Sequence, residues 1–140
     1  WCENFKRLDA NTQKRITVEN DDKGSMWSTK HLFDYIHSDI GIPIVFDYHH
    51  YKFCTGGQTE QEALELAMST WPDGITPVVH YSQSRAEEHN DPKIRPQAHS
   101  DSYWAAPNLY GHDLYVMCEC KHKEQGVFAL LELMKDKAVA

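Results

Sequence analysis

Hydrophobic and polar positions in this chain follow two different periods. Apolar residues recur at helical spacing in four stretches, which predicts helices over residues 1–13, 28–37, 59–71 and 124–134. Shorter apolar runs predict strands at residues 16–19, 42–46, 76–80 and 114–120. Ser28 is the expected N-cap of the second helix, and Gly41 breaks it. The pattern therefore predicts strands that alternate with helices.

This alternation is typical of α/β proteins, in which helical crossovers connect neighbouring parallel strands. The polar residues that end the predicted strands are separated by 28, 33 and 39 positions, and they are Glu19, Asp47, His80 and Glu119. A (β/α)8 TIM barrel uses about 31 residues per unit. We therefore expect a single domain over residues 1–140 that forms about the C-terminal half of a TIM-type barrel, with an insertion after His80.

Half a barrel has two open strand edges. Because the chain also starts inside a predicted helix without an initiator methionine, we expect it to be the C-terminal part of a longer protein. The fragment alone is expected to dimerise or aggregate and to be inactive, whereas the full-length protein is expected to be monomeric.

The composition narrows the function. The chain has 140 residues, of which 41% are hydrophobic and 25% charged, as in an ordinary globular domain. Its net charge of −7 argues against nucleic-acid binding through bulk positive charge, unless metal cations neutralise the carboxylates. No apolar run reaches the ~18 residues of a membrane span. Four cysteines without a C-x-x-C pair and the lack of a secretory leader favour a reducing, cytoplasmic location.

Each predicted strand ends on a side chain that can bind a metal. A single carboxylate there often only caps the next helix, but a series of four indicates a shared site, because strand ends form the active-site face of such barrels. His50 belongs to the same candidate site if the chain turns at Asp47. Mixed carboxylate and imidazole ligands suit Mn²⁺, Zn²⁺ or Fe²⁺.

The chain has nine histidines, and the others receive different interpretations. His49 is interpreted as a residue behind the ligands or facing solvent. Four histidines fall on helices or polar loops and are interpreted as surface residues: His31, His37, His89 and His122. His112 stays open.

Five ordered motifs carry a family resemblance. They are Val18-Glu19-Asn20-Asp21-Asp22, Ile42-Pro43-Ile44-Val45-Phe46-Asp47-Tyr48-His49-His50, His80-Tyr81-Ser82, Ala98-His99-Ser100-Asp101 and Glu119-Cys120-Lys121-His122-Lys123-Glu124. Together they resemble the C-terminal half of the UV damage endonucleases, which are (β/α)8-barrel nucleases related to endonuclease IV. The resemblance implies metal ligation by Glu19, Asp47, His50, His80, His99 and Glu119. It adds His99 to the ligands, with Asp101 as a weaker candidate ligand or partner of a ligating imidazole.

The resemblance also implies an activity. The reaction would be hydrolysis of DNA 5′ to UV photoproducts in double-stranded DNA, during DNA repair, by two or three divalent ions of manganese type, with Zn²⁺ or Mg²⁺ as alternatives. Glu19, Glu119 and His80 would carry the catalytic role. Candidate contacts to DNA are Tyr51, Lys52, Tyr81, Arg85, Lys93, Arg95, Tyr103, Trp104, Lys121 and Lys123.

One position departs from the family pattern. A Lys commonly lies two residues before the strand-end His, and Val78 occupies that position here. Two other functions stay open. A Mn-dependent barrel sugar isomerase or epimerase also gathers Glu, Asp and His at its strand ends. The Val78 departure favours the second alternative, a non-catalytic remnant that binds DNA or metal.

Overall fold

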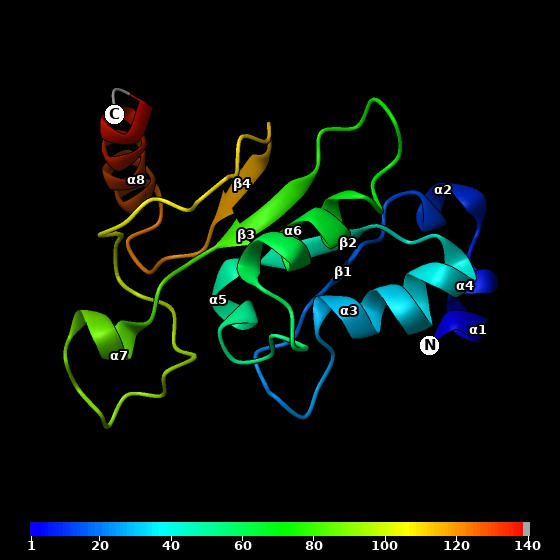
Figure 1. The fold of residues 1–140 in the computed structure, drawn as a ribbon, viewed down its shortest axis with the longest axis horizontal. Helices are drawn as coiled ribbons and strands as arrows, with labels where there is room; N and C mark the ends of the chain where they lie inside the picture. The colour runs from blue at the N-terminus through cyan, green and yellow to red at the C-terminus, as the bar shows by residue number, and fades with distance from the viewer. Residues whose placement is uncertain (139–140) are drawn as a thin grey trace.

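A four-stranded parallel sheet forms the centre of the computed structural model, which describes residues 1–138 (Figure 1). The strand order is the chain order: β1 (Val18–Glu19), β2 (Ile44–Asp47), β3 (Val78–Tyr81) and β4 (Tyr115–Cys118). Each neighbouring pair is parallel, with Asp47 aligned with His80 across β2 and β3. The predicted α/β fold with a parallel sheet is confirmed.

Helices precede, connect and follow these strands. They are α1 (Cys2–Lys6), α2 (Ala10–Gln13), α3 (Thr29–Leu32), the π-helical turn η1 (Phe33–His37), α4 (Ser38–Ile40), α5 (Tyr48–Tyr51), α6 (Glu60–Met68), α7 (Arg85–Glu88) and α8 (Glu124–Ala138). Ser28 caps α3 as predicted, and Gly41 ends α4 with a positive φ of 68°. The predictions missed the short helices α5 and α7.

The prediction of one helix over residues 1–13 is wrong. The chain forms α1 and α2 as separate helices. Asp9 has an extended backbone, and its carboxylate accepts hydrogen bonds from the N–H groups of Asn11 and Thr12. This side chain begins a new helix, so the apolar periodicity continues across a break in the backbone.

The core lies between one face of the sheet and the helices that cover it. Ile44 and Phe46 point into this layer and are fully buried, as are Ala63 and Leu64 of α6, which packs on β2. All four residues of β2 are buried, which agrees with its continuous apolar run. The core thus fixes the position of β2 and of the residues that follow it.

The opposite face of the sheet carries the polar strand ends. Because side chains alternate along a strand and aligned residues share a face, Glu19, Asp47, His80 and Met117 project to this side. β1 and β4 each have one strand neighbour within the described residues. Across residues 1–138, no helix is both long and apolar enough to span a membrane.

The long connection between β3 and β4 is tied to the core by tyrosines. Tyr48 donates its hydroxyl proton to the Asn108 carbonyl at 2.8 Å, and Tyr81 donates to the Ala105 carbonyl at 2.8 Å. Tyr103 in turn donates to the backbone carbonyl of Tyr81 at 3.0 Å. These bonds hold the connection against the sheet near the strand ends.

Candidate metal centre

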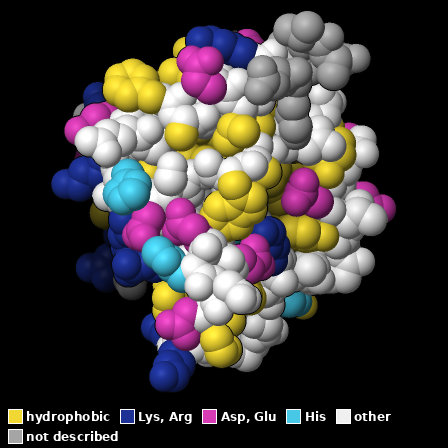
Figure 2. Space-filling model, turned by 90° about the vertical axis from the view of Figure 1, so that its left-hand side faces the viewer, with side chains coloured by type: hydrophobic (Ala, Val, Ile, Leu, Met, Phe, Trp, Pro, Cys, Tyr) yellow, Lys and Arg dark blue, Asp and Glu magenta, His cyan; other side chains and the backbone are white. Residues whose placement is uncertain are grey.

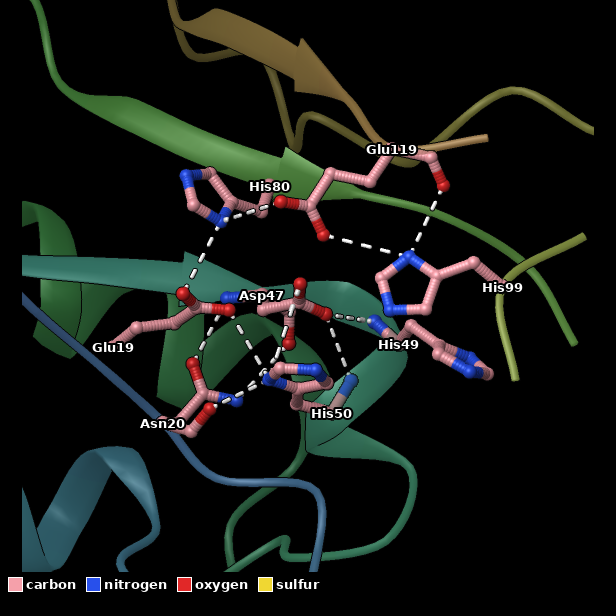
Figure 3. Close-up of polar contacts among 8 residues, drawn as sticks. All are labelled: Glu19, Asn20, Asp47, His49, His50, His80, His99 and Glu119. Carbon is pink, nitrogen blue, oxygen red and sulfur yellow. Dashed lines mark hydrogen bonds and ion pairs between the residues drawn. The ribbon is translucent and has the colours of Figure 1, made fainter. Parts of the chain in front are cut away.

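The carboxyl ends of the four strands bring together the acidic and histidine residues that the strand-end pattern predicts (Figure 3). His80 Nδ1 lies 3.2 Å from Glu19 Oε2 and 3.5 Å from Glu119 Oε1. His50 Nδ1 lies 3.1 Å from Glu19 Oε1, and Asp47 is buried between the strands. All five side chains predicted from strand ends and the turn after Asp47 therefore belong to one cluster. The face that contains this end of the sheet presents acidic and histidine side chains next to one another, with lysine and arginine side chains among and around them (Figure 2).

Asp47 organises the turn that returns His50 to the cluster. Its Oδ1 accepts hydrogen bonds from the backbone N–H groups of His49 at 2.7 Å and His50 at 2.8 Å, and so caps α5. Oδ2 is buried and has no hydrogen-bond partner among the described residues. One carboxylate oxygen therefore builds the local structure, and the other is left for a ligand.

Asn20 is a residue that the sequence predictions missed. It is 1% exposed, its side-chain N–H donates to the Asp47 carbonyl at 3.0 Å, and its Oδ1 accepts from the Asp47 N–H at 2.8 Å. β1 ends at Glu19, so this side-chain amide takes the place of a peptide group in the ladder beside β2. Its position directly after the strand-end Glu19 was the available signal.

Backbone contacts set the tautomers of two histidines. Nδ1 of His50 lies 2.9 Å from the Asn20 carbonyl, and Nδ1 of His99 lies 3.2 Å from the Glu119 carbonyl. A carbonyl oxygen only accepts, so in each contact Nδ1 donates a proton, and in the neutral ring Nε2 keeps the lone pair. The structure thus brings His99 to the cluster, as the family resemblance implies, and both imidazoles have a nitrogen suited to ligation.

The ionisation of the cluster follows from burial and close pairs. Burial disfavours the Glu19 carboxylate, but the contacts with His50 and His80 outweigh it and hold the pKa of Glu19 well below its usual range. Burial opposes protonation of His50, yet Glu19 and Asp47 raise its pKa to about 9. Contact with Glu19 also raises the pKa of His80. Burial raises the pKa of Asp47 to about 7, with His50 opposing it.

The donor atoms fit a divalent cation. One ligand atom from each of Glu19, Asp47 and His80 lies within 4.8 Å of the others. Asp47 Oδ2 is buried without a hydrogen-bond partner in the described part of the chain, which costs free energy unless another group binds it. His80 Nδ1 is also buried, and it faces the carboxylates of Glu19 and Glu119 at 3.2 and 3.5 Å. Oxygen and imidazole donors together suit Mn²⁺ or Zn²⁺ better than Ca²⁺.

His49 does not face solvent. It is 0% exposed, and neither ring nitrogen has a hydrogen-bond partner among the described residues. Its ring points away from the carboxylates and packs edge-on against Phe53 at 5.2 Å and His99 at 5.6 Å between centroids (Figure 3). Of the two interpretations, the structure selects the residue behind the ligands.

The structure gives several of the residues predicted to contact DNA a different role. Tyr81 and Tyr103 are 7% and 6% exposed, stack on each other at 5.4 Å and donate their hydroxyl protons to backbone carbonyls, so they are core residues. Tyr51 is half-buried and donates to the Gln58 carbonyl. Burial removes Tyr81 and Tyr103 from the residues that can stack on a base. The cationic candidates and Trp104 remain at the surface: Lys52, Lys93, Arg95, Trp104, Lys121 and Lys123 are exposed, and Arg85 is partly exposed.

Asp101 does not join the cluster. Its carboxylate lies 2.7 Å from His89 Nε2 and 3.3 Å from Arg85 Nε, so these contacts do not support the prediction of a ligand or a partner of a ligating imidazole. Of the other histidines, His31 and His122 are exposed, and His37 contacts the Ile42 carbonyl. His112 lies 4.0 Å from Glu65. Val78 is partly buried on the same sheet face as His80, as expected.

Comparisons with known proteins agree with this geometry. A family model described as UV-endonuclease UvdE matches residues 1–139. A UV DNA damage endonuclease of Bacillus cereus (strain G9842) is 33% identical over 137 residues, which cover 93% of this chain and 41% of that protein. A UV-damage endonuclease of Neurospora crassa is 30% identical over 145 residues, which cover 94% of this chain and 21% of that protein.

A solved structure gives the same result. The crystal structure of SacUVDE superposes with a TM-score of 0.78 at 28% identity, covering 98% of this chain and 45% of that one. The chain therefore spans less than half the length of the relatives that it matches.

Proposed function

Since the chain belongs to the UV-endonuclease UvdE family, we propose that it forms part of a metal-dependent DNA repair endonuclease that hydrolyses a phosphodiester bond 5′ to UV photoproducts. One observation carries this proposal. Ligand atoms of Glu19, Asp47 and His80 converge within 4.8 Å, and Oδ2 of Asp47 is buried without a hydrogen-bond partner in the described residues. The family assignment favours the nuclease over the sugar isomerase or epimerase.

Six residues would hold the ions in this proposal: Glu19, Asp47, His50, His80, His99 and Glu119. Two or three ions of manganese type are expected, with Zn²⁺ or Mg²⁺ as alternatives. Bound divalent ions lower the pKa of a coordinated water and stabilise the oxygen that leaves the phosphate. Glu19 and Glu119 flank His80, and their carboxylates would supply oxygen ligands to the ions.

The remaining residues of the centre orient the ligands. Asn20 fixes the end of β2 through both polar groups of the Asp47 backbone. The Asn20 and Glu119 carbonyls hold the rings of His50 and His99 in the tautomer that leaves Nε2 available. These contacts orient the ligand side chains before the ions bind.

The charge balance of the chain is consistent with a phosphate substrate only when cations are bound. The net charge is −7, and the centre itself is rich in carboxylates, which repel a DNA backbone. Bound divalent ions reverse the local potential. Exposed Lys52 and Lys121 follow the ligands His50 and Glu119 in the chain and are the favoured phosphate contacts.

We also propose that the four strands are half of a closed (β/α)8 barrel. Their parallel pairing in chain order agrees with such a barrel, and the chain covers 45% of SacUVDE. In this arrangement the edges of β1 and β4 would pair with strands of the rest of the protein.

The test is a nicking assay with the intact protein. Supercoiled plasmid, either irradiated at UV wavelengths or untreated, is incubated with the protein and Mn²⁺, with a chelator as the metal control. We expect nicking of irradiated plasmid only, its loss with the chelator and in His80→Ala, and its retention in His112→Ala, because His112 lies outside the centre. A labelled duplex with one photoproduct then locates the cut. Equal nicking of both plasmids, or no nicking of either, would refute the proposal. The absence of nicking would favour the non-catalytic remnant that binds DNA or metal.

A further inference from the structure

The connection between β3 and β4 delivers His99 to the metal centre through a closed loop. Ser84 and His99 form an antiparallel bridge. Beside it, the N–H of Arg85 donates to the Ala98 carbonyl at 2.7 Å, and the N–H of Ser100 donates to the Gln83 carbonyl at 2.8 Å. These bonds hold the backbone on the side of the loop nearest β3.

The Glu88 carboxylate closes the other side of this loop, next to two backbone bonds in which the N–H groups of Lys121 and His122 donate to the Ser100 and Asp101 carbonyls at 2.9 and 2.8 Å. Glu88, the last residue of α7, accepts a hydrogen bond from the N–H of Asp101 at 2.6 Å through Oε2 and from the N–H of Ser102 at 3.0 Å through Oε1. Its side chain is largely buried, at 20% exposure. Charge-assisted hydrogen bonds of this length are stronger than neutral ones, so this contact restrains the two residues that follow Ser100.

The side chain of Asp101 reinforces the closure. It accepts from His89 Nε2 at 2.7 Å and lies 3.3 Å from Arg85 Nε, which ties the loop back to α7 and its C-cap. Glu88, His89 and Asp101 bring potential ligand atoms close together. However, backbone N–H groups occupy both oxygens of Glu88, and the Arg85 guanidinium neutralises Asp101, so these residues form a structural clasp and not a cation site.

His99 depends on this loop for its position. Among the described residues its ring makes one hydrogen bond, from Nδ1 to the Glu119 carbonyl at 3.2 Å, with Glu119 Oε2 at 3.5 Å. Otherwise the ring packs on His49 and His50, with centroids at 5.6 and 6.2 Å. Unlike His50 and His80, His99 lies outside the helices and strands, so the restraint must come from the backbone on either side of it.

We propose that Glu88 is a positioning residue, which fixes His99 for ligation by clasping the N–H groups of Asp101 and Ser102. This inference rests on the proposed metal-binding function, because its consequence is measured as metal affinity. Groups that orient a ligand from behind typically contribute about 10–100-fold to metal affinity. The loss should be confined to the ion that His99 binds.

The experiment compares three variants of the intact protein. Glu88→Ala removes both accepted hydrogen bonds, and Glu88→Gln keeps one neutral acceptor oxygen. Glu87→Ala is the matched control, since Glu87 is the exposed neighbour on the same helix. Mn²⁺ affinity is measured by calorimetry, and hydrogen exchange of the Asp101 and Ser102 amides reports on the clasp independently of metal.

We expect Glu88→Ala to weaken one class of Mn²⁺ sites by about 10–100-fold, with faster exchange at both amides and the other class unchanged. Glu88→Gln should lie between it and the parent, and Glu87→Ala should match the parent. If amide exchange becomes faster while the Mn²⁺ affinity stays at the parental value, the positioning role of Glu88 is overturned and the proposed function is not affected. If the parent binds no Mn²⁺, the proposed function fails as well. If Glu88→Ala does not fold, Glu88→Gln decides, and failure of both variants to fold would overturn a positioning role.

Discussion

Replacing Asn20 by alanine tests how the strand ends are held in place. The Asn20 side chain satisfies both polar groups of the Asp47 backbone, at 3.0 Å and 2.8 Å, in a position that is 1% exposed. Alanine cannot replace either hydrogen bond. The variant leaves one buried N–H and one buried carbonyl without their partner, directly beside the carboxylate at the middle of the metal centre.

The expected loss can be estimated from these two groups. A buried polar group that loses its partner costs roughly 1–3 kcal/mol, so the pair gives about 2–6 kcal/mol in the free energy of unfolding. Water that enters the space of the missing amide would bring the value towards the lower end. Because marginal stability is ordinarily about 5–15 kcal/mol, the variant should still fold but unfold at clearly lower denaturant.

The assay is urea unfolding of the intact protein at neutral pH, followed by Mn²⁺ titration in the absence of denaturant. Asn4→Ala is the control, because Asn4 is exposed in α1 and a surface substitution should change stability by less than about 0.5 kcal/mol. We expect a large loss in the free energy of unfolding, together with weakened Mn²⁺ binding, only in Asn20→Ala. A loss below about 1 kcal/mol would refute the view that Asn20 replaces a peptide group beside β2.

Three further predictions concern the same centre. His50→Ala should remove bound manganese and nicking while leaving the circular dichroism spectrum unchanged, and elemental analysis that finds full metal would contradict this. Val78→Lys should increase Mn²⁺ occupancy or the nicking rate, because Val78 shares the sheet face of His80. The cost of burying a lysine opposes this increase. If both quantities stay at the parental values, the site has adapted to valine. Burial lowers the pKa of His49 to about 4, whereas the unfolded chain protonates this residue near 6.5. The unfolded state therefore binds more protons between these values, and the stability that the neutral imidazole contributes is present above pH 6.5 and lost as the pH falls towards 4. Replacing His49 by Phe should remove about 3 kcal/mol of this pH dependence in urea unfolding, and parallel curves for parent and variant would exclude the assignment.

Much of the fold could be predicted from local pattern. Period and length separated the strands from the helices, and the capping residues Ser28 and Thr59 begin helices as their chemistry favours. The break between α1 and α2 was also encoded locally, in Asp9, but the apolar periodicity across it was the stronger pattern. Such errors arise where two local signals conflict.

The sequence also determined most of the candidate site. Carboxyl ends of parallel strands meet at one edge of a sheet, so Glu19, Asp47, His80 and Glu119 had to lie close together once the strands were identified. The turn at Asp47 added His50. These five positions follow from topology alone, without knowledge of any side-chain contact.

Only the tertiary structure decided the other roles. The burial of Tyr81 and His49, the pairing of Asp101 with His89 and the closure of the His99 loop by Glu88 depend on groups that are distant in sequence or on burial by other elements. Periodicity describes the direction of a side chain within its own element. Whether that direction ends in solvent, in the core or at a partner depends on how the elements pack against each other, and a local pattern contains no information about that packing.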